Sequence, residues 1–125
     1  MRPKILAVDD AKAVRNLVHS VLSPFDCDVR EAANGYNALF MMEQGLPDLI
    51  ILDINMPIMG GVQMLTMLKS KPELEKIPVI MLASPTDHPV IDEIKQLGVS
   101  GILMKPFKKV SLLEMIRSVL VLNEK

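Results

Sequence analysis

The chain has 125 residues, half of them hydrophobic and 23% charged, and its formal net charge is −1. We expect one globular domain over residues 1–125, because this length and balance suit a single core. The lack of a basic excess argues against direct binding of nucleic acid, and no apolar run is long enough to span a membrane. The one cysteine, Cys27, excludes an internal disulfide and suits a reducing cytoplasm.

Apolar runs of strand length alternate along the chain with stretches in which apolar residues recur at helical spacing. The predicted strands are Lys4–Asp10, Cys27–Ala32, Asp48–Asp53, Ile77–Ser84 and Gly101–Pro106. The predicted helices carry apolar residues at 14–22 and 38–42, then run over about 62–70, from a cap at Asp87 to near Gly98, and over Lys109–Leu122.

Continuous apolar strands separated by helices indicate a parallel sheet that is covered on both faces. Right-handed crossovers then make the sheet doubly wound. The predicted class is therefore α/β, with five parallel strands in alternating (βα)5 order.

Polar side chains collect where the predicted strands end. The first strand ends in Asp9 and Asp10, the third in Asp53 with Asn55 two residues on, the fourth in Ser84, and the fifth in Lys105 before Pro106. Doubly wound sheets bind ligands at the carboxyl ends of their strands, near the switch in strand order. If these strands are neighbours, one crevice holds three carboxylates, a hydroxyl and an ammonium.

Three carboxylates in one crevice repel one another, and their pKa values rise unless a cation lies among them. Hard oxygen ligands select Mg²⁺ or Mn²⁺, and a partly hydrated ion leaves room for a phosphoryl oxygen. Lys105 offers a second positive charge and Ser84 a hydroxyl donor, which suits the positioning that phosphoryl transfer needs. Because aspartate is a known phosphoryl nucleophile, we interpret Asp53 as a phosphoryl acceptor.

Each of these residues also has an ordinary explanation. Asp10 could cap the first helix, Asp53 could be a turn acid, Ser84 could be a turn hydroxyl and Lys105 could be solvated. Their joint placement at the ends of four predicted strands favours the functional interpretation.

Four short motifs resemble the receiver domain of two-component response regulators, over essentially the whole chain. They are VDD (8–10), LDINMPIMGG (52–61), LAS (82–84) and KPF (105–107). The resemblance, in particular to single-domain chemotaxis regulators, implies a flavodoxin-like sheet with the strand order 2-1-3-4-5.

The resemblance implies that Asp53 takes a phosphoryl group from a phosphohistidine. The donor would be a sensor histidine kinase or a histidine phosphotransfer protein. Asp10 and Asp53 would bind Mg²⁺ directly and Asp9 through water, with the backbone carbonyl of Asn55 as a further ligand. Such a chain is a phospho-acceptor that assists its own phosphorylation and dephosphorylation, and is not a conventional enzyme.

Lys105 and Ser84 would both contact the phosphoryl group, Ser84 after a movement that repacks the last two strand ends and their flanking helices. The lifetime of the aspartyl phosphate would depend on what orients the hydrolytic water. Thr86 stands two residues after Ser84 and cannot do this as an acid could, which leaves Asn55 to do it alone.

The chain departs from the family at two positions beside the site. Ile102 stands three residues before Lys105, where members usually carry an aromatic that turns inward as the hydroxyl moves. Pro85 follows Ser84 and has no N–H to offer the phosphoryl group. The alternative function is therefore a receiver-like adaptor that binds a partner without switching, although the intact strand-end residues argue against it.

The predicted last helix has a wide apolar face that spans about half of its circumference. Its members are Leu112, Leu113, Met115, Ile116, Val119, Leu120 and Leu122. One edge of this face should pack on the sheet. The other edge is explained either by ordinary packing or by a surface for a homodimer or an output partner.

Overall fold

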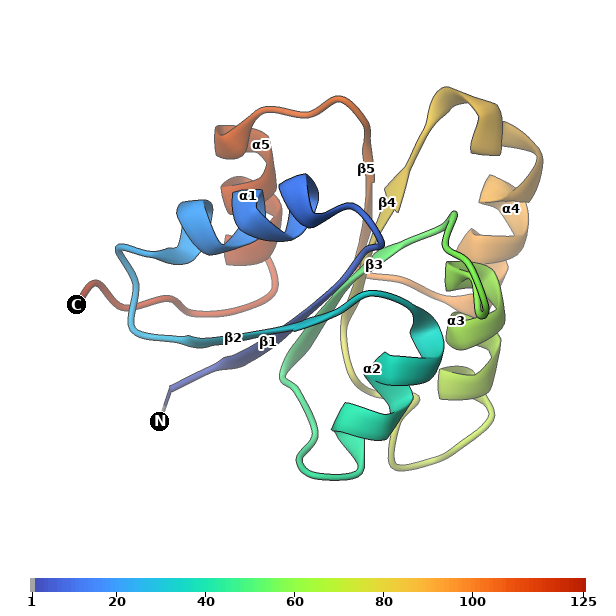
Figure 1. Ribbon diagram of the computed structural model, residues 1–125, viewed down its shortest axis with the longest axis horizontal. Helices are drawn as coiled ribbons and strands as arrows, with labels where there is room; N and C mark the ends of the chain where they lie inside the picture. The colour runs from blue at the N-terminus through green and yellow to red at the C-terminus, as the bar shows by residue number, and fades with distance from the viewer. Residues whose placement is uncertain (1) are drawn as a thin grey trace.

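The computed structural model describes residues 2–125, in which five parallel strands alternate with five helices (Figure 1). The strands are β1 (Lys4–Val8), β2 (Asp28–Ala32), β3 (Leu49–Asp53), β4 (Val79–Ala83) and β5 (Gly101–Met104). The helices are α1 (Lys12–Leu22), α2 (Gly35–Met42), α3 (Gly61–Lys69), α4 (His88–Leu97) and α5 (Lys109–Arg117). A short 3-10 helix, Pro85–Asp87, precedes α4. No helix in this part of the chain is long and apolar enough to cross a membrane.

The sheet has the strand order β2-β1-β3-β4-β5, and each neighbouring pair is parallel. In Figure 1, α1 and α5 lie on one side of the sheet and α2, α3 and α4 lie on the other. The predicted α/β class and the order 2-1-3-4-5 are therefore confirmed.

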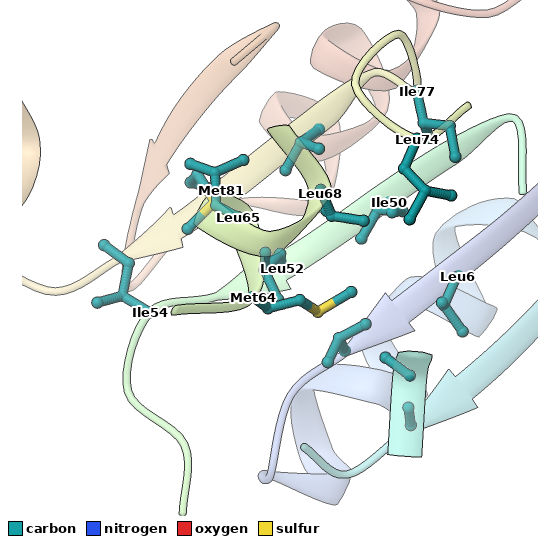
Figure 2. Close-up of a cluster of buried hydrophobic side chains, with 14 of the residues drawn as sticks. Leu6, Ile50, Leu52, Ile54, Met64, Leu65, Leu68, Leu74, Ile77 and Met81 are labelled. Atoms are coloured by element: carbon teal, nitrogen blue, oxygen red, sulfur yellow. The ribbon is translucent and has the colours of Figure 1, made fainter. Parts of the chain in front are cut away.

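The two faces of the sheet bury alternate residues of the same strand, because successive side chains of a strand point to opposite faces. In β3, Ile50 and Leu52 belong to the core beneath α2, α3 and α4, whereas Leu49 and Ile51 belong to the core beneath α1 and α5. Figure 2 shows Leu52 beside Met64 and Ile50 beside Leu68, two side chains of α3. Full burial of each such side chain contributes about 1.5–3 kcal/mol, which explains why β3 is apolar without interruption.

The register of the sheet brings the acids of two strands together. Val8 pairs with Leu52 across β1 and β3, so the residues that follow each of them, Asp9 and Asp53, lie side by side. Asp53 in turn pairs with Leu82 of β4. The acid-bearing ends of β1 and β3 therefore lie next to each other, with the end of β4 beside them.

The predicted last helix is too long, because α5 ends at Arg117 and not at Leu122. The hydroxyl of Ser118 donates a hydrogen bond of 2.6 Å to the carbonyl of Met115, and such a side-chain bond competes with continued helix. The residues beyond then run back beside the segment before β2, where Asp26 N donates to Asn123 O at 2.7 Å.

The apolar face predicted for that helix is correspondingly shorter. Leu112 and Ile116 are buried against the sheet, Val110 on the helix is exposed, and Val121 beyond the helix is also exposed. Ordinary packing therefore accounts for the central part of the face.

Gly61 should be intolerant of any side chain, because α3 begins there directly against β3. A Cβ at this position would collide with the backbone carbonyl of Asp53 and lie 2.9 Å from Ile54 Cα. We expect Gly61→Ala to lower the free energy of unfolding by about 3 kcal/mol, as overpacking against backbone does. Urea denaturation measures this change.

The matched control is Gly45→Ala, where the nearest atom to an added Cβ is Lys4 Nζ at 3.9 Å. This loop substitution should change the free energy of unfolding by less than about 1 kcal/mol. Equal denaturation midpoints for the two variants would contradict the close approach of α3 to β3.

Candidate functional site

The three predicted carboxylates lie together at the carboxyl ends of β1 and β3. Asp9, Asp10 and Asp53 each offer an oxygen atom, and these atoms all lie within 4.8 Å of one another. Asp9 and Asp53 are 2% and 3% exposed, whereas Asp10 is open to solvent. Clustered hard oxygens that are reachable from one side suit a divalent cation.

Lys105 reaches this cluster from the loop after β5. Its Nζ donates hydrogen bonds of 3.0 Å to Asp9 Oδ2 and 3.0 Å to Asp53 Oδ1. One ammonium therefore joins acids that lie 96 and 52 residues away along the chain. Since it offsets only one of three carboxylate charges, the crevice keeps an excess of negative charge for a cation to neutralise.

Asp53 and Lys105 both have raised pKa values, for different reasons. Burial is the largest influence on Asp53 and raises the pKa of its carboxyl; the hydrogen bond from Lys105 lowers it, and the charges of Asp9 and Asp10 raise it further. For Lys105, burial on its own would lower the pKa, but the hydrogen bonds to Asp9 and Asp53 outweigh burial and raise it. The fold therefore favours the charged form of Lys105 and disfavours the ionised form of Asp53.

The alternative that Asp10 caps the first helix is wrong. The N-cap of α1 is Ala11, and it is Asp9 Oδ1 that accepts the Ala11 N–H at 2.8 Å. Both carboxylate oxygens of Asp9 are thus engaged, one by Ala11 and one by Lys105. Within residues 2–125, Asp10 has no hydrogen bond or ion pair of its own, so its carboxylate is open to a metal ion.

Ser84 is half-buried at the end of β4 and opens the short 3-10 helix. Its N–H donates a hydrogen bond of 2.7 Å to Asp87 Oδ2. Pro85 has no N–H, and the N–H of Ser84 is already bound to Asp87. Neither of the first two residues of this loop therefore has a free backbone donor. The hydroxyl of Ser84 is therefore the donor that this residue has left to offer a ligand.

Asp87 is the N-cap residue of α4, as predicted, but its side chain makes no capping hydrogen bond to that helix. Its carboxylate turns back into the 3-10 helix, where it holds Ser84 N and also accepts the Asn55 Nδ2 at 2.6 Å. Asn55 is exposed, and its amide faces this acid across the gap between two loops. The Ser-x-x-Asp spacing over 84–87 is a capping-box pattern and could have indicated the contact with Ser84, but nothing local could have indicated Asn55.

The fold and this site together define a doubly wound α/β domain whose strand ends carry paired acids, a hydroxyl and a lysine. A family model described as the response regulator receiver domain matches residues 5–117. The chain belongs to this family.

Three relatives illustrate the similarity. Chemotaxis protein CheY-3 of Vibrio cholerae is 36% identical over 112 residues, which cover 89% of this chain and 86% of that protein. Sporulation initiation phosphotransferase F of Bacillus subtilis is 36% identical over 107 residues, covering 86% and 85%. The structure of the chemotaxis response regulator CheY4 of Vibrio cholerae matches with a TM-score of 0.87 and 33% identity, covering 96% of this chain and all of that one. The family and these relatives support a function in two-component signalling.

The raised pKa of Asp53 predicts that Asp53→Asn stabilises the fold near neutral pH when no divalent ion is present. A carboxyl whose pKa is raised by folding binds its proton more tightly in the folded state, so its ionisation destabilises that state. The neutral amide removes this penalty, and we expect a gain larger than the ~0.5 kcal/mol of ordinary surface substitutions. The gain should vanish below the ordinary carboxyl pKa, where Asp53 is protonated in both states.

Urea unfolding near neutral pH and near pH ~3 tests this expectation. The control is Asp92→Asn, which removes the charge of an exposed carboxylate on α4. If Asp53→Asn gives no more stability than the control, the burial penalty on Asp53 is not the dominant effect.

Proposed function

We propose that this chain is a phosphorylatable receiver whose Asp53 accepts a phosphoryl group in the presence of Mg²⁺ or Mn²⁺. The donor is a phosphohistidine on a sensor histidine kinase or a histidine phosphotransfer protein. The observation that carries the proposal is the meeting of Asp9, Asp10, Asp53 and Lys105 at neighbouring strand ends. A structural role alone would not require a third, solvent-facing acid in this cluster.

The residues present fit a hard divalent ion. Asp10 has an unengaged carboxylate, Asp53 has one oxygen that Lys105 does not hold, and Asp9 is already bonded at both oxygens. This pattern supports direct ligation by Asp10 and Asp53, with Asp9 acting at longer range and the backbone carbonyl of Asn55 as a further ligand. A bound ion would supply the positive charge that neutralises phosphoryl oxygens during transfer.

Phosphoryl transfer needs a carboxylate that is held in a fixed direction and charge that is neutralised on the phosphoryl oxygens. Lys105 fixes the direction of the Asp53 carboxylate through Oδ1, so that one of its two oxygens can bind the ion while the other attacks phosphorus. The new bond joins that oxygen to phosphorus, and the bond from phosphorus to the donor imidazole breaks with its electron pair on nitrogen. The chain thus promotes a reaction on itself and is a phospho-acceptor more than a conventional enzyme.

The signal would leave the site through Ser84 and the face built from β4, β5, α4 and α5. Ile102 is half-buried on β5 and lines a groove with His88 and Ile91 of α4, so a movement of the Ser84 loop would be felt there. A homodimer or output surface on the last helix stays a prediction, now confined to α5 and its exposed Val110.

Incubation with acetyl phosphate and Mg²⁺, followed by intact-mass spectrometry, tests the phosphoryl acceptor. We expect the wild type to gain one phosphoryl group and Asp53→Ala to gain none, because the attacking oxygen is removed. Asp92→Ala removes an exposed acid on α4 and should label like the wild type. Chelation of Mg²⁺ should suppress labelling.

A wild-type chain that takes up no phosphoryl group, from acetyl phosphate or from a histidine kinase, would contradict the proposed function. It would favour the adaptor alternative, in which Pro85 and Ile102 accompany a loss of switching.

Pro85→Ala should strengthen Mg²⁺-dependent binding of beryllofluoride, a phosphoryl mimic. The substitution restores an N–H at a position where Ser84 N is already committed to Asp87. One added hydrogen bond to a charged group corresponds to about tenfold in affinity. Calorimetric titration measures it, and Pro89→Ala in the first turn of α4 is the matched control. Equal affinities for the two variants would show that the lost N–H has no consequence.

A further inference from the structure

The loop that follows the phosphoryl acceptor and the loop that carries Ser84 are joined by one buried carboxylate. Asp87 is 7% exposed, and each of its oxygens accepts one hydrogen bond. Oδ1 takes the Asn55 amide at 2.6 Å and Oδ2 takes the Ser84 N–H at 2.7 Å. Buried side-chain bonds to a charged acceptor are among the stronger hydrogen bonds in proteins, so this bridge fixes both partners.

The chemistry of Asp87 also settles which way the Asn55 amide is turned. An ionised carboxylate can only accept hydrogen bonds, so the amide must present its NH₂ group to Asp87. The amide oxygen, Asn55 Oδ1, is then the end without a protein donor among the described residues. Asn55 stands two residues after Asp53, so this oxygen belongs to the loop that adjoins the phosphoryl site.

An amide oxygen at such a site can accept a hydrogen bond from water, whereas an amide NH₂ group cannot. In hydrolysis of the aspartyl phosphate, the water oxygen forms a bond to phosphorus and the bond from phosphorus to the Asp53 oxygen breaks. Asp53 leaves as a carboxylate, the product is hydrogen phosphate, and one proton passes to solvent. A group that accepts a hydrogen bond from the water turns its lone pair toward phosphorus.

We propose that Asp87 is a positioning residue that sets the lifetime of the phosphoryl group on Asp53, by holding the Asn55 amide with its oxygen free for the hydrolytic water. Asp87 touches neither water nor phosphoryl group and acts through Asn55. This inference rests on the proposed function. Asp87 would thus supply the acid that is missing at Thr86. It stands one residue further along the chain and acts on the water indirectly, through Asn55.

The decisive variant is Asp87→Asn, which keeps the size of the side chain and the acceptor for Ser84 N but places an NH₂ group opposite Asn55. Two NH₂ groups cannot bond to each other, so the Asn55 amide must turn over or let go. We expect hydrolysis of the aspartyl phosphate to slow about fivefold, the effect of one neutral hydrogen bond. Asp87→Ala should slow it similarly, and Asp92→Asn on α4 should leave it unchanged.

The assay labels each protein with radioactive acetyl phosphate and Mg²⁺, removes the donor by rapid desalting, and follows loss of label from the protein. The same substitution is then made in an Asn55→Ala background. If Asp87 acts through Asn55, Asp87→Asn should cause no further change there. A role in stability alone would not depend on Asn55, and urea unfolding of each variant measures that role separately.

A second measurement uses the unphosphorylated protein. In NMR spectra, Asp87→Asn should shift the side-chain amide resonances of Asn55, and Asp92→Asn should not. If the wild type is phosphorylated but the lifetime of the phosphoryl group is the same in the Asp87 variants, this inference is overturned and the proposed function stands. Equal slowing by Asp87→Asn in both backgrounds would also overturn it. A wild type that accepts no phosphoryl group would overturn both.

Discussion

The pair of hydrogen bonds from Lys105 to Asp9 and Asp53 is the interaction on which the site depends. The three residues come from three strand ends. Because β1 and β3 are adjacent in the sheet, Asp9 and Asp53 both lie 3.0 Å from the Lys105 ammonium. Without the lysine, two carboxylates that are almost fully buried would face each other and Asp10 without compensation. Loss of the partner of a buried charge commonly destabilises a protein by 3–5 kcal/mol, so the lysine links the geometry of the crevice to the integrity of the fold.

The burial of Asp53 opposes the stability of the fold, because it disfavours the charged carboxylate. The largest influence on Asp53 is burial, which raises the pKa of its carboxyl, and Lys105 only partly offsets it. A core built for stability alone would place an apolar or neutral side chain at the end of β3. The excess negative charge has a use if a cation binds there, because a ligand that binds only the folded state stabilises it by mass action. Under the proposed function, metal binding and phosphorylation would then depend on one cluster.

Much of the fold and of the site could be predicted from the sequence because the signals are local. Each inner strand is an apolar run, and its polar residue stands at its end or directly after it, as Asp53 does at the end of β3. The end of the last helix could not be predicted, since it depends on the chain beyond Arg117 pairing with residues near Asp26, about a hundred positions away. The role of Asp87 was missed for a related reason. Its spacing from Ser84 fits a turn as well as a helix cap, and its bond to Asn55 spans 32 residues.

The two departures from the family near Ser84 can now be considered together. Pro85 lacks a backbone donor and Asp87 occupies the donor just before it, Ser84 N, so the start of the β4–α4 loop is stiff and would offer a phosphoryl group little besides the Ser84 hydroxyl. A stiff loop transmits a small displacement as a rigid unit, because packed elements have discrete arrangements and do not deform continuously. Ile102 then need not swing inward as a large aromatic would. A shift of the Ser84 turn carries Asp87, Asp87 is bonded to Asn55, and α4 begins at the very next residue. In this chain the loop after Asp53 is therefore tied to the start of α4 by one hydrogen-bonded carboxylate, that of Asp87.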